Sequence, residues 1–427
     1  MKRGFYTIMA AQFFSSLADN ALFVAAVELL RSHGGQEWQR AALVPMFALF
    51  YVVLAPFVGA FADSRPKGWV MFVSNAIKVV GCLLMLFGGH PLLAYAVVGL
   101  GAAAYSPAKY GILTELLPPS QLVKANGWIE GLTIASIILG IVLGGQLIGS
   151  RLSAVLLDID LPGIHTGIDT PAEAAISAMV LVYALAAAIN LHIPHTGVEM
   201  RPLPARKLAL LADFWRCNAR LWRDKLGQIS LATTTLFWGA SGNLKYIVLP
   251  WAAVALGYNT TQASALTGVL AVGTAVGAVV ASARMRLDTA TRVIPLGVLM
   301  GAAVIAMVFI DQLWLALPFL VFLGALGGYI VVPMNALLQH RGHNLMGAGR
   351  SIAVQNFNEQ ACILALGALY SASTGFGLPA FGAIALFGGV VTVVMLAIQL
   401  WHMHNLRHRT AEVEQLLRIA RSDPGHH

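Results

Sequence analysis

Residues 91–116 read PLLAYAVVGLGAAAYSPAKYGILTEL, a mostly apolar run long enough to form a helix that crosses a membrane. Lys109 lies inside this run, and Tyr105 and Pro107 precede it among small residues. A cation within a membrane span is costly, so it marks a transport pathway or a paired site. The stretch therefore predicts a membrane helix with a functional lysine, and the rest of the chain should supply the partners of that lysine.

Apolar segments of this length recur along the whole chain of 427 residues, of which 58% are hydrophobic and only 11% charged. This composition lies outside the range of soluble globular domains and predicts an all-α polytopic membrane protein. We expect twelve transmembrane helices, in two six-helix halves, near residues 5–30, 41–61, 69–88, 91–116, 124–149, 172–193, 228–255, 262–282, 292–310, 313–337, 349–371 and 376–402.

The basic residues predict the orientation. The chain has 27 Lys and Arg residues. With the N-terminus inside, only Arg31, Arg40 and Arg151 fall in outer loops, and most of the others fall on the inner side. The positive-inside rule then places both termini in the cytoplasm. The net charge of +8 is thereby explained by topology and by contact with membrane lipids, and nucleic-acid binding is not expected.

A proline-containing basic loop divides the chain. We expect an N-terminal bundle at 1–193, a cytoplasmic linker at 194–227, a C-terminal bundle at 228–402 and a cytoplasmic tail at 403–427. Within the linker, Leu208–Leu226 predicts a short amphipathic helix on the inner leaflet. One constant offset places Pro107 on Pro333, Lys109 on Asn335, Lys124 on Arg350 and Glu130 on Asn356, which indicates an internal duplication.

The loop between the second and third spans reads GAFADSRPKG from Gly59 to Gly68, and it resembles the loop signature of the major facilitator superfamily. Gly59 permits close helix approach, and Asp63 can accept hydrogen bonds from a helix N-terminus, which would close an inner gate. Arg65 and Lys67 complete the predicted gate loop. Ser64 and Pro66 depart from the family pattern, so some of its charge pairing should be weaker.

Further segments are similar to the bacterial lysophospholipid transporter family of that superfamily. They are QFFSSLADNAL from Gln12, APFVGAFADS from Ala55, YSPAKYGIL from Tyr105, LVKANG from Leu122, FWG from Phe237 and SIAVQNFN from Ser351. The resemblance implies a flippase that moves lysophospholipids, such as lysophosphatidylethanolamine, from the outer to the inner leaflet by alternating access. It also implies a cytoplasmic-side acyltransferase that consumes them. No cofactor or metal is expected, and we expect a monomer.

Polar residues inside the predicted spans are the candidate substrate-binding or gating residues. We expect Asp19 and Lys245 to form a salt bridge between the halves on the outer side, and Lys109 to work with Glu130 or Glu359 nearer the cytoplasm. Lys78 is expected in a structural pair or at the interface. The remaining candidates are polar residues of the same spans, namely Asn20, Tyr105, Asn335 and Asn356.

Three other classes of function are open to test. An enzyme is not expected, because the chain has no P-loop, HExxH or GxSxG string, and its three cysteines lie in separate segments. A proton-coupled exporter of drugs or amphipathic metabolites is the alternative within the superfamily, although residues 124–149 lack the proline of its fifth-helix signature. A scaffold without transport has no need of mid-membrane charges.

Overall fold

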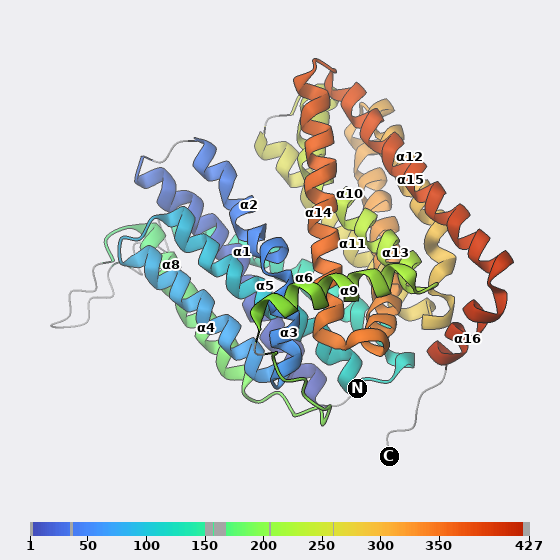
Figure 1. Cartoon of the computed structure of the whole chain (residues 1–427). Helices are drawn as coiled ribbons and strands as arrows, with labels where there is room; N and C mark the ends of the chain where they lie inside the picture. Colours follow the sequence, from blue (N-terminus) through green and yellow to red (C-terminus); the bar gives the residue numbers. More distant parts are fainter. Residues whose placement is uncertain are drawn as a thin grey trace. The chain divides into compact units, whose positions relative to one another are not determined.

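The computed structural model describes residues 3–34, 37–149, 157, 168–204, 206–258 and 260–421, and within its helices the side chains at 3, 37, 38, 40, 41, 207, 245, 246, 260 and 261 are outside the description. The described elements are helices (Figure 1). Their bounds are α1 Arg3–Ser32, α2 Glu37–Val53, α3 Ala55–Ser64, α4 Lys67–Leu86, α5 Pro91–Leu116, α6 Pro119–Ile148, α8 Pro171–Asn190, α9 Lys207–Arg223, α10 Gly227–Leu256, α11 Thr260–Arg284, η1 Leu287–Val293, α12 Ile294–Ala306, η2 Met307–Phe309, α13 Leu313–Met346, α14 Ala348–Gly375, α15 Ala380–His408 and α16 Thr410–Arg421.

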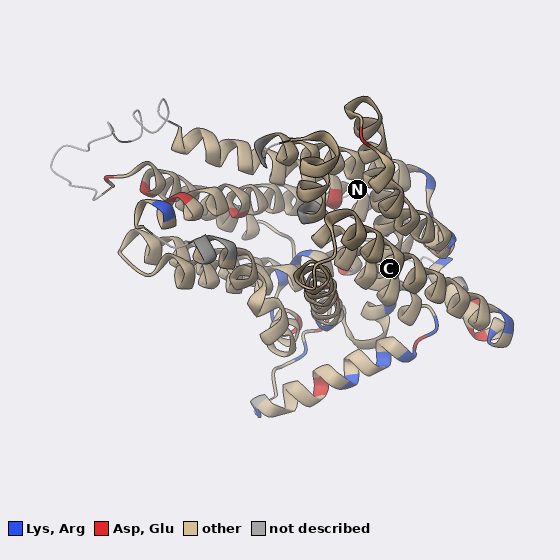
Figure 2. Cartoon of the chain, turned by 90° about the horizontal axis from the view of Figure 1, so that it is seen from above, with Lys and Arg blue, Asp and Glu red and all other residues tan. Residues whose placement is uncertain are grey.

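The helices confirm the predicted class of fold. A helical segment occupies each of the twelve predicted spans. Among the described residues, nine helices are long and apolar enough to cross a membrane, and the bent pair α2 and α3 makes a tenth span if it is counted as one. Figure 2 shows that most of the helical ribbon carries neither sign of charge, as a lipid-embedded bundle requires.

The second predicted span is broken. The sequence predicted one helix at 41–61, but α2 ends at Val53 and α3 begins at Ala55 with a bend of 64° between them. Pro56 lies in the first turn of α3, where its missing N–H group costs nothing. In a continuous helix the same ring would clash with the carbonyl of residue 52 and remove one hydrogen bond, so the helix restarts here.

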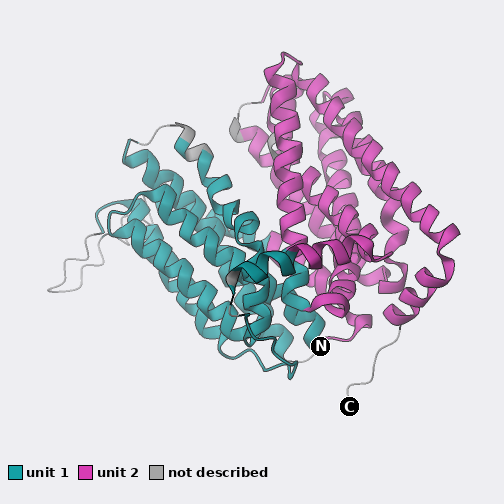
Figure 3. Cartoon of the chain, viewed as in Figure 1, with its two compact units in different colours: residues 1–116, 135–214, 348–353 teal, residues 117–134, 215–347, 354–427 magenta. Residues whose placement is uncertain are grey.

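The chain forms two compact units (Figure 3). Unit 1 comprises residues 1–116, 135–214 and 348–353, and unit 2 comprises residues 117–134, 215–347 and 354–427. The helices α6 and α14 each contribute residues to both units, as does α9. The start of α6 thus belongs to unit 2, and the start of α14 belongs to unit 1. The predicted boundaries of the two halves do not contain this division.

Unit 1 is held together by close helix contacts at glycines. On α5, a Cβ at Gly101 would lie 2.6 Å from the backbone oxygen of Ser74 and 2.7 Å from Cγ of Lys78, both on α4. Near the other end of the unit, a Cβ at Gly144 of α6 would lie 2.8 Å from the backbone oxygen of Ala21 on α1. Small residues thus let these backbones touch, which is the main source of helix association in lipid.

In unit 2 the same device joins α11 to α13. A Cβ at Gly273 or Gly277 would collide with backbone atoms of α13, and a Cβ at Gly324 or Gly328 would collide with backbone atoms of α11. The pair Gly273/Gly277 on α11 therefore packs against the pair Gly324/Gly328 on α13. Reciprocal pairs four residues apart give a long, close interface between two membrane helices.

Two helices outside the predicted spans are amphipathic. The helix α9 covers most of the segment Leu208–Leu226, for which an amphipathic helix was predicted. The helix α16 follows α15 along the chain. On α16, Val413 and Ala420 are buried, and Arg421 pairs with Asp288 of η1 at 2.8 Å between Nε and Oδ2.

Candidate gate and charged sites

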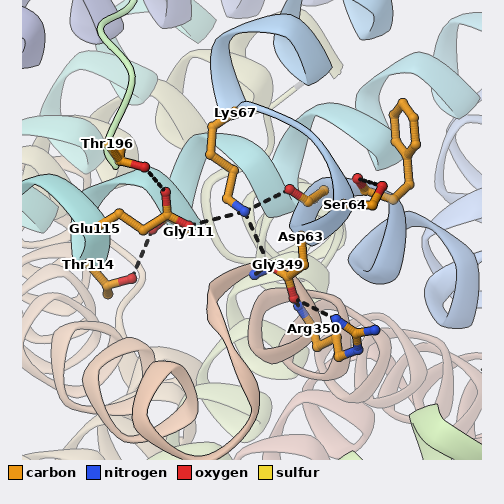
Figure 4. A network of polar contacts seen from close by, with 11 residues as sticks. Asp63, Ser64, Lys67, Gly111, Thr114, Glu115, Thr196, Gly349 and Arg350 are labelled. Atoms are coloured by element: carbon orange, nitrogen blue, oxygen red, sulfur yellow. Dashed lines mark hydrogen bonds and ion pairs between the residues drawn. The ribbon is translucent and has the colours of Figure 1, made fainter. Parts of the chain in front are cut away.

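The first candidate site is a group of charged residues around Asp63, at the end of α3 (Figure 4). Oδ1 of Asp63 accepts from the backbone N–H of Gly349 at 2.6 Å, and Oδ2 accepts from the backbone N–H of Arg350 at 3.0 Å. The Arg350 side chain adds an ion pair at 3.2 Å from Nη1. A carboxylate thus caps the first turn of α14, where unpaired N–H groups and the helix dipole favour negative charge.

Lys67 links Asp63 to α5. Its Nζ lies 3.1 Å from Oδ1 of Asp63 and 3.1 Å from Oε1 of Glu115, and it donates to the backbone oxygen of Ala62 at 2.7 Å. Oε2 of Glu115 accepts from the hydroxyl of Thr196 at 2.8 Å. The side chains of Asp63, Lys67 and Glu115 are each about one-twentieth exposed, so these pairs are buried and each charge has a partner. We name Asp63, Lys67, Glu115 and Arg350 the Asp63 cluster.

Small residues surround the Asp63 cluster. A Cβ at Gly59 would lie 2.6 Å from Cβ of Ala353, and a Cβ at Gly349 would lie 2.7 Å from the backbone oxygen of Gly59. Glycine at these two positions lets α3 approach the first turn of α14 closely enough for Asp63 to reach its N–H groups. The close helix approach predicted for Gly59 is present in the structure.

Arg65 is the residue of the predicted gate loop that lies elsewhere. Its side chain is exposed, and its guanidinium lies 5.8 Å from the ring centroid of Trp69 on the first turn of α4, so it lies apart from the Asp63 cluster. Of the two predicted cations of the loop, Lys67 pairs with Asp63, and Arg350 of α14 supplies a second cation.

The second candidate site surrounds Asp19 on α1. Nζ of Lys78 on α4 lies 2.8 Å from Oδ1 and 2.9 Å from Oδ2 of Asp19, and it also donates to the hydroxyl of Ser15 at 3.0 Å. The hydroxyl of Tyr183 on α8 donates to Oδ1 of Asp19 at 2.7 Å. Ser15 donates to Oδ1 of Asn75 at 2.8 Å. We name these five residues the Asp19 cluster.

Lys78 is the centre of the Asp19 cluster. Its side chain is 1% exposed, and its Nζ lies 5.1 Å and 5.4 Å from the ring centroids of Tyr105 and Tyr183. Aromatic faces stabilise a desolvated cation, so they offset part of the cost of burial. Two buried donors beside it, Nδ2 of Asn75 and the hydroxyl of Tyr105, have no hydrogen-bond partner in the described structure.

The structure gives Asp19 a partner that the sequence did not assign to it. Asp19 pairs with Lys78, and both residues belong to unit 1. The Lys245 side chain lies outside the described residues, so the expected salt bridge between Asp19 and Lys245 stays a prediction. Lys78 was expected in a structural pair or at the interface, and a pair is what it forms. Asn20 does not join the cluster, because its side chain donates to the backbone oxygen of Ser16 on its own helix.

The third candidate site is a group of buried polar side chains in unit 2. Asn126 on α6 and Gln339 on α13 exchange two hydrogen bonds, each of 2.9 Å. Reciprocal amide pairs of this kind join two membrane helices without charge. Gln339 is one of the residues that the sequence did not single out, and its position on the same face as Asn335, four residues earlier, was the available signal.

Glu359 lies in a second polar group of unit 2. The Gln355 side chain donates from Nε2 to Oε1 of Glu359 at 2.7 Å and to Oδ1 of Asn335 at 3.0 Å. Glu130, of the α6 segment in unit 2, is close enough to interact electrostatically with Glu359, and both carboxylates are buried. Asn356 is one turn before Glu359 on α14 and also makes polar contacts.

Lys109 lies in unit 1, with Nζ 4.0 Å from the ring centroid of Tyr110, and its side chain is buried. Glu130 and Glu359 belong to unit 2, so the expected pairing of Lys109 with these acids stays a prediction. Within the described residues, no group of three His, Cys, Asp or Glu side chains is placed to hold a metal ion.

A small cavity inside unit 2 has a mostly apolar lining from α10, α11, α12, α13 and α15. Phe237 and Leu244 line it from α10, and Phe387 lines it from α15. Ser241 and Thr274 supply its few polar atoms. Gly324, one of the glycines at the α11–α13 interface, also lines this cavity.

Long apolar helices with charged side chains buried among them define a polytopic membrane protein. A family model described as "Major Facilitator Superfamily" matches residues 8–360, so the chain belongs to the major facilitator superfamily. Solved structures agree on the fold: the human organic anion transporter MFSD10 (TETRAN) has a TM-score of 0.70 at 14% identity, covering 93% of this chain and 100% of that chain. A bacterial homologue of the iron transporter ferroportin has a TM-score of 0.68 at 15% identity, covering 94% and 99%.

Curated relatives narrow the family. The "Lysophospholipid transporter LplT" of Yersinia enterocolitica serotype O:8 / biotype 1B is 42% identical over 380 residues, which are 89% of each chain. The protein of the same name from Yersinia pestis (strain Pestoides F) is 40% identical over the same shares. Within the superfamily, the chain belongs to the bacterial family of these two relatives.

Proposed function

We propose that the chain transports lysophospholipids, such as lysophosphatidylethanolamine, across a membrane. The observation that carries this proposal is the 42% identity to a lysophospholipid transporter over 89% of both chains. The matched region of 380 residues is long enough to include most of the predicted spans of this chain. We expect neither enzymatic activity nor a cofactor.

The proposed direction is from the outer to the inner leaflet of the bacterial inner membrane. The distribution of Lys and Arg supports cytoplasmic positions for both termini and for α9. Two six-helix bundles, at 1–193 and 228–402, would alternate access to a central site, with 194–227 as linker and 403–427 as tail. A cytoplasmic-side acyltransferase is the proposed consumer of the transported lipid.

The lipid head group is proposed to meet the buried charges. Asp19 is about one-fifth exposed, whereas Lys78 behind it is almost fully buried, so Asp19 is the accessible member of the pair. A carboxylate there suits the ammonium of an ethanolamine head group. Lys109 and Lys245 are the proposed cations for the phosphate, because a phosphate oxygen binds strongly to an ammonium group.

The Asp63 cluster is proposed to be the inner gate. Its contacts join loop residues of the first predicted bundle to the start of α14, a helix of the second predicted bundle. Opening toward the cytoplasm would then require the N–H groups of Gly349 and Arg350 to leave the Asp63 carboxylate. Lys67 is also bound to Glu115 and to the backbone oxygen of Ala62, so it would stay beside the Asp63 carboxylate in both states.

Uptake of radiolabelled lysophosphatidylethanolamine into bacterial spheroplasts tests the proposal. Cells that express the chain should accumulate the lipid faster than cells with an empty vector. Asp63→Asn should reduce that rate severalfold, whereas Arg65→Gln should not, because Arg65 lies outside the Asp63 cluster. Efflux of a cationic dye without lysophospholipid uptake would contradict the proposal and favour the exporter.

A further inference from the structure

The helix α9 buries one side against the protein. Leu210, Phe214, Cys217 and Leu221 are each at most 6% exposed. They recur at intervals of three and four residues, so they form a single stripe along the helix. This stripe accounts for the attachment of α9 to the bundle and leaves the rest of its circumference to be explained.

A second apolar stripe on α9 is exposed. Leu208 is 77% exposed, Leu211 37% and Trp215 54%. At about 100° per residue these three side chains fall on one side of the helix, well away from the buried stripe. Three large apolar side chains in a row are costly in water, so the stripe calls for an apolar environment.

A row of arginines occupies the remaining face of α9, about a third of a turn from the exposed apolar stripe. Arg216, Arg220 and Arg223 are exposed and follow one another at intervals of three and four residues. In the described structure, Arg220 and Arg223 make no ion pair with an acidic side chain. A helix with a Trp and Leu stripe next to an arginine row has the composition of one that lies in the interface of an anionic membrane.

We propose that α9 binds anionic phospholipids of the inner leaflet. Leu208, Leu211 and Trp215 would lie among the acyl chains, and Arg220 and Arg223 would hold the phosphates. A lipid suits this surface better than a protein, because tryptophan next to arginine matches the boundary between head groups and chains. The bound lipid is thus part of the cytoplasmic face of the transporter and is distinct from its substrate.

The same helix is connected to the Asp63 cluster. Asp213 of α9 accepts from Nε of Arg350 at 2.9 Å, and Arg350 in turn pairs with Asp63 at 3.2 Å. A lipid that fixes α9 in the interface therefore fixes Asp213 and helps to hold Arg350 at the carboxylate. Anionic lipid should consequently change the transport rate through Asp213, an effect that rests on the proposed function.

Quenching of Trp215 by brominated lipid tests the binding. Full-length protein in detergent is titrated with brominated phosphatidylglycerol or brominated phosphatidylcholine, and the signal of the Trp215→Phe variant is subtracted. We expect Trp215 to be quenched at much lower concentrations of the anionic lipid. Each arginine at an anionic surface contributes a factor of about five in affinity. The pair Arg220→Gln/Arg223→Gln should therefore weaken the anionic preference by about 25-fold.

Arg407→Gln/Arg409→Gln is the matched control, since it removes two exposed arginines from the end of α15. It should leave the quenching curve unchanged. Equal quenching by both lipids, or no quenching at all, would overturn the proposal and leave a soluble partner as the occupant of the stripe. Equal loss in the control pair would also overturn it, because the effect would then belong to overall charge.

Transport in proteoliposomes tests the connection to Asp213. As the fraction of phosphatidylglycerol rises, uptake of lysophosphatidylethanolamine should change severalfold in the wild type and stay flat in Asp213→Asn. A wild-type rate independent of phosphatidylglycerol would refute the connection. Absence of lysophospholipid transport in every lipid mixture would instead contradict the proposed function, while the quenching experiment would still decide whether α9 binds lipid.

Discussion

Removal of one partner from the Asp19–Lys78 pair should destabilise unit 1 unequally. Breaking a buried ion pair costs about 3–5 kcal/mol, because the remaining charge is left without compensation. Lys78→Met leaves a carboxylate that is 21% exposed and still accepts from Tyr183, so its cost should be near about 3 kcal/mol. Asp19→Asn leaves an ammonium group that is 1% exposed, so its cost should be near about 5 kcal/mol.

The double variant Asp19→Asn/Lys78→Met should recover most of the lost stability. Replacing a buried pair by neutral side chains of similar volume is often neutral or stabilising. Thermal unfolding of the full-length protein in detergent measures the difference. Each kcal/mol corresponds to about 2–4 °C for a unit of 150–250 residues, so Lys78→Met should lower the midpoint by about 6–12 °C. The double variant should return to within about 4 °C of the wild type.

Uptake then separates folding from transport. If Asp19 meets the head group, the double variant should be stable but transport lysophosphatidylethanolamine at least about tenfold more slowly, a barrier increase of about 1.4 kcal/mol. Unchanged unfolding of Lys78→Met would refute the pair itself. A stable double variant with wild-type uptake would refute the role of Asp19 in substrate binding and leave the cluster a structural one.

Three further substitutions test the packing and the gate by thermal unfolding. Gly59→Leu should lower the midpoint strongly, since its Cβ alone would meet Ala353, whereas Gly131→Leu should not, because no atom lies within 4 Å of a Cβ there. On α11, Gly277→Ala should cost about 1–3 kcal/mol and Gly268→Ala nothing, because only the first faces a neighbouring backbone. Glu115→Gln removes one of the two carboxylates that contact Lys67, and it should lower the free energy of unfolding by about 1–3 kcal/mol. A variant as stable as the wild type at pH 7 would contradict this prediction.

The positions of the helices could be predicted from the sequence because lipid permits few alternatives. Every backbone N–H and C=O group must be satisfied within the segment, so a long apolar run becomes a helix. The exception is the break at Leu54, where Pro56 ends one helix and starts the next. Whether a proline breaks a membrane helix depends on whether neighbouring groups satisfy the carbonyl that the proline leaves without a hydrogen bond. Pro107 interrupts neither α5 nor its register, although it stands inside the helix.

The contact of Asp63 with a helix N-terminus could also be predicted. Gly59 allows two helices to approach closely, and a carboxylate nearby can accept hydrogen bonds from the unpaired N–H groups of a helix N-terminus. The partner of Asp19 could not. Asp19 and Ser15 share one face of α1, and Asn75 and Lys78 share one face of α4. These two polar stripes were visible in the sequence, but which of three intramembrane lysines meets Asp19 depends on the packing of α1 against its neighbours.

The offset that predicts an internal duplication relates residues of different chemistry. The offset that aligns Lys109 with Asn335 also aligns Glu115 with Arg341. Each of these two residues forms an ion pair with a side chain of opposite charge. Glu115 holds Lys67, whereas Arg341 holds Asp224 with 2.6 Å between Nη2 and Oδ1, just before α10. An ion pair thus occurs at both positions that this offset relates, with its sign reversed. The other buried charges of unit 1 include Asp63, Lys78 and Lys109, whereas unit 2 buries the acids Glu130 and Glu359. The substrate site of such a protein should therefore be asymmetric, with the lipid phosphate nearer the cation of the first repeat than the neutral Asn335 of the second.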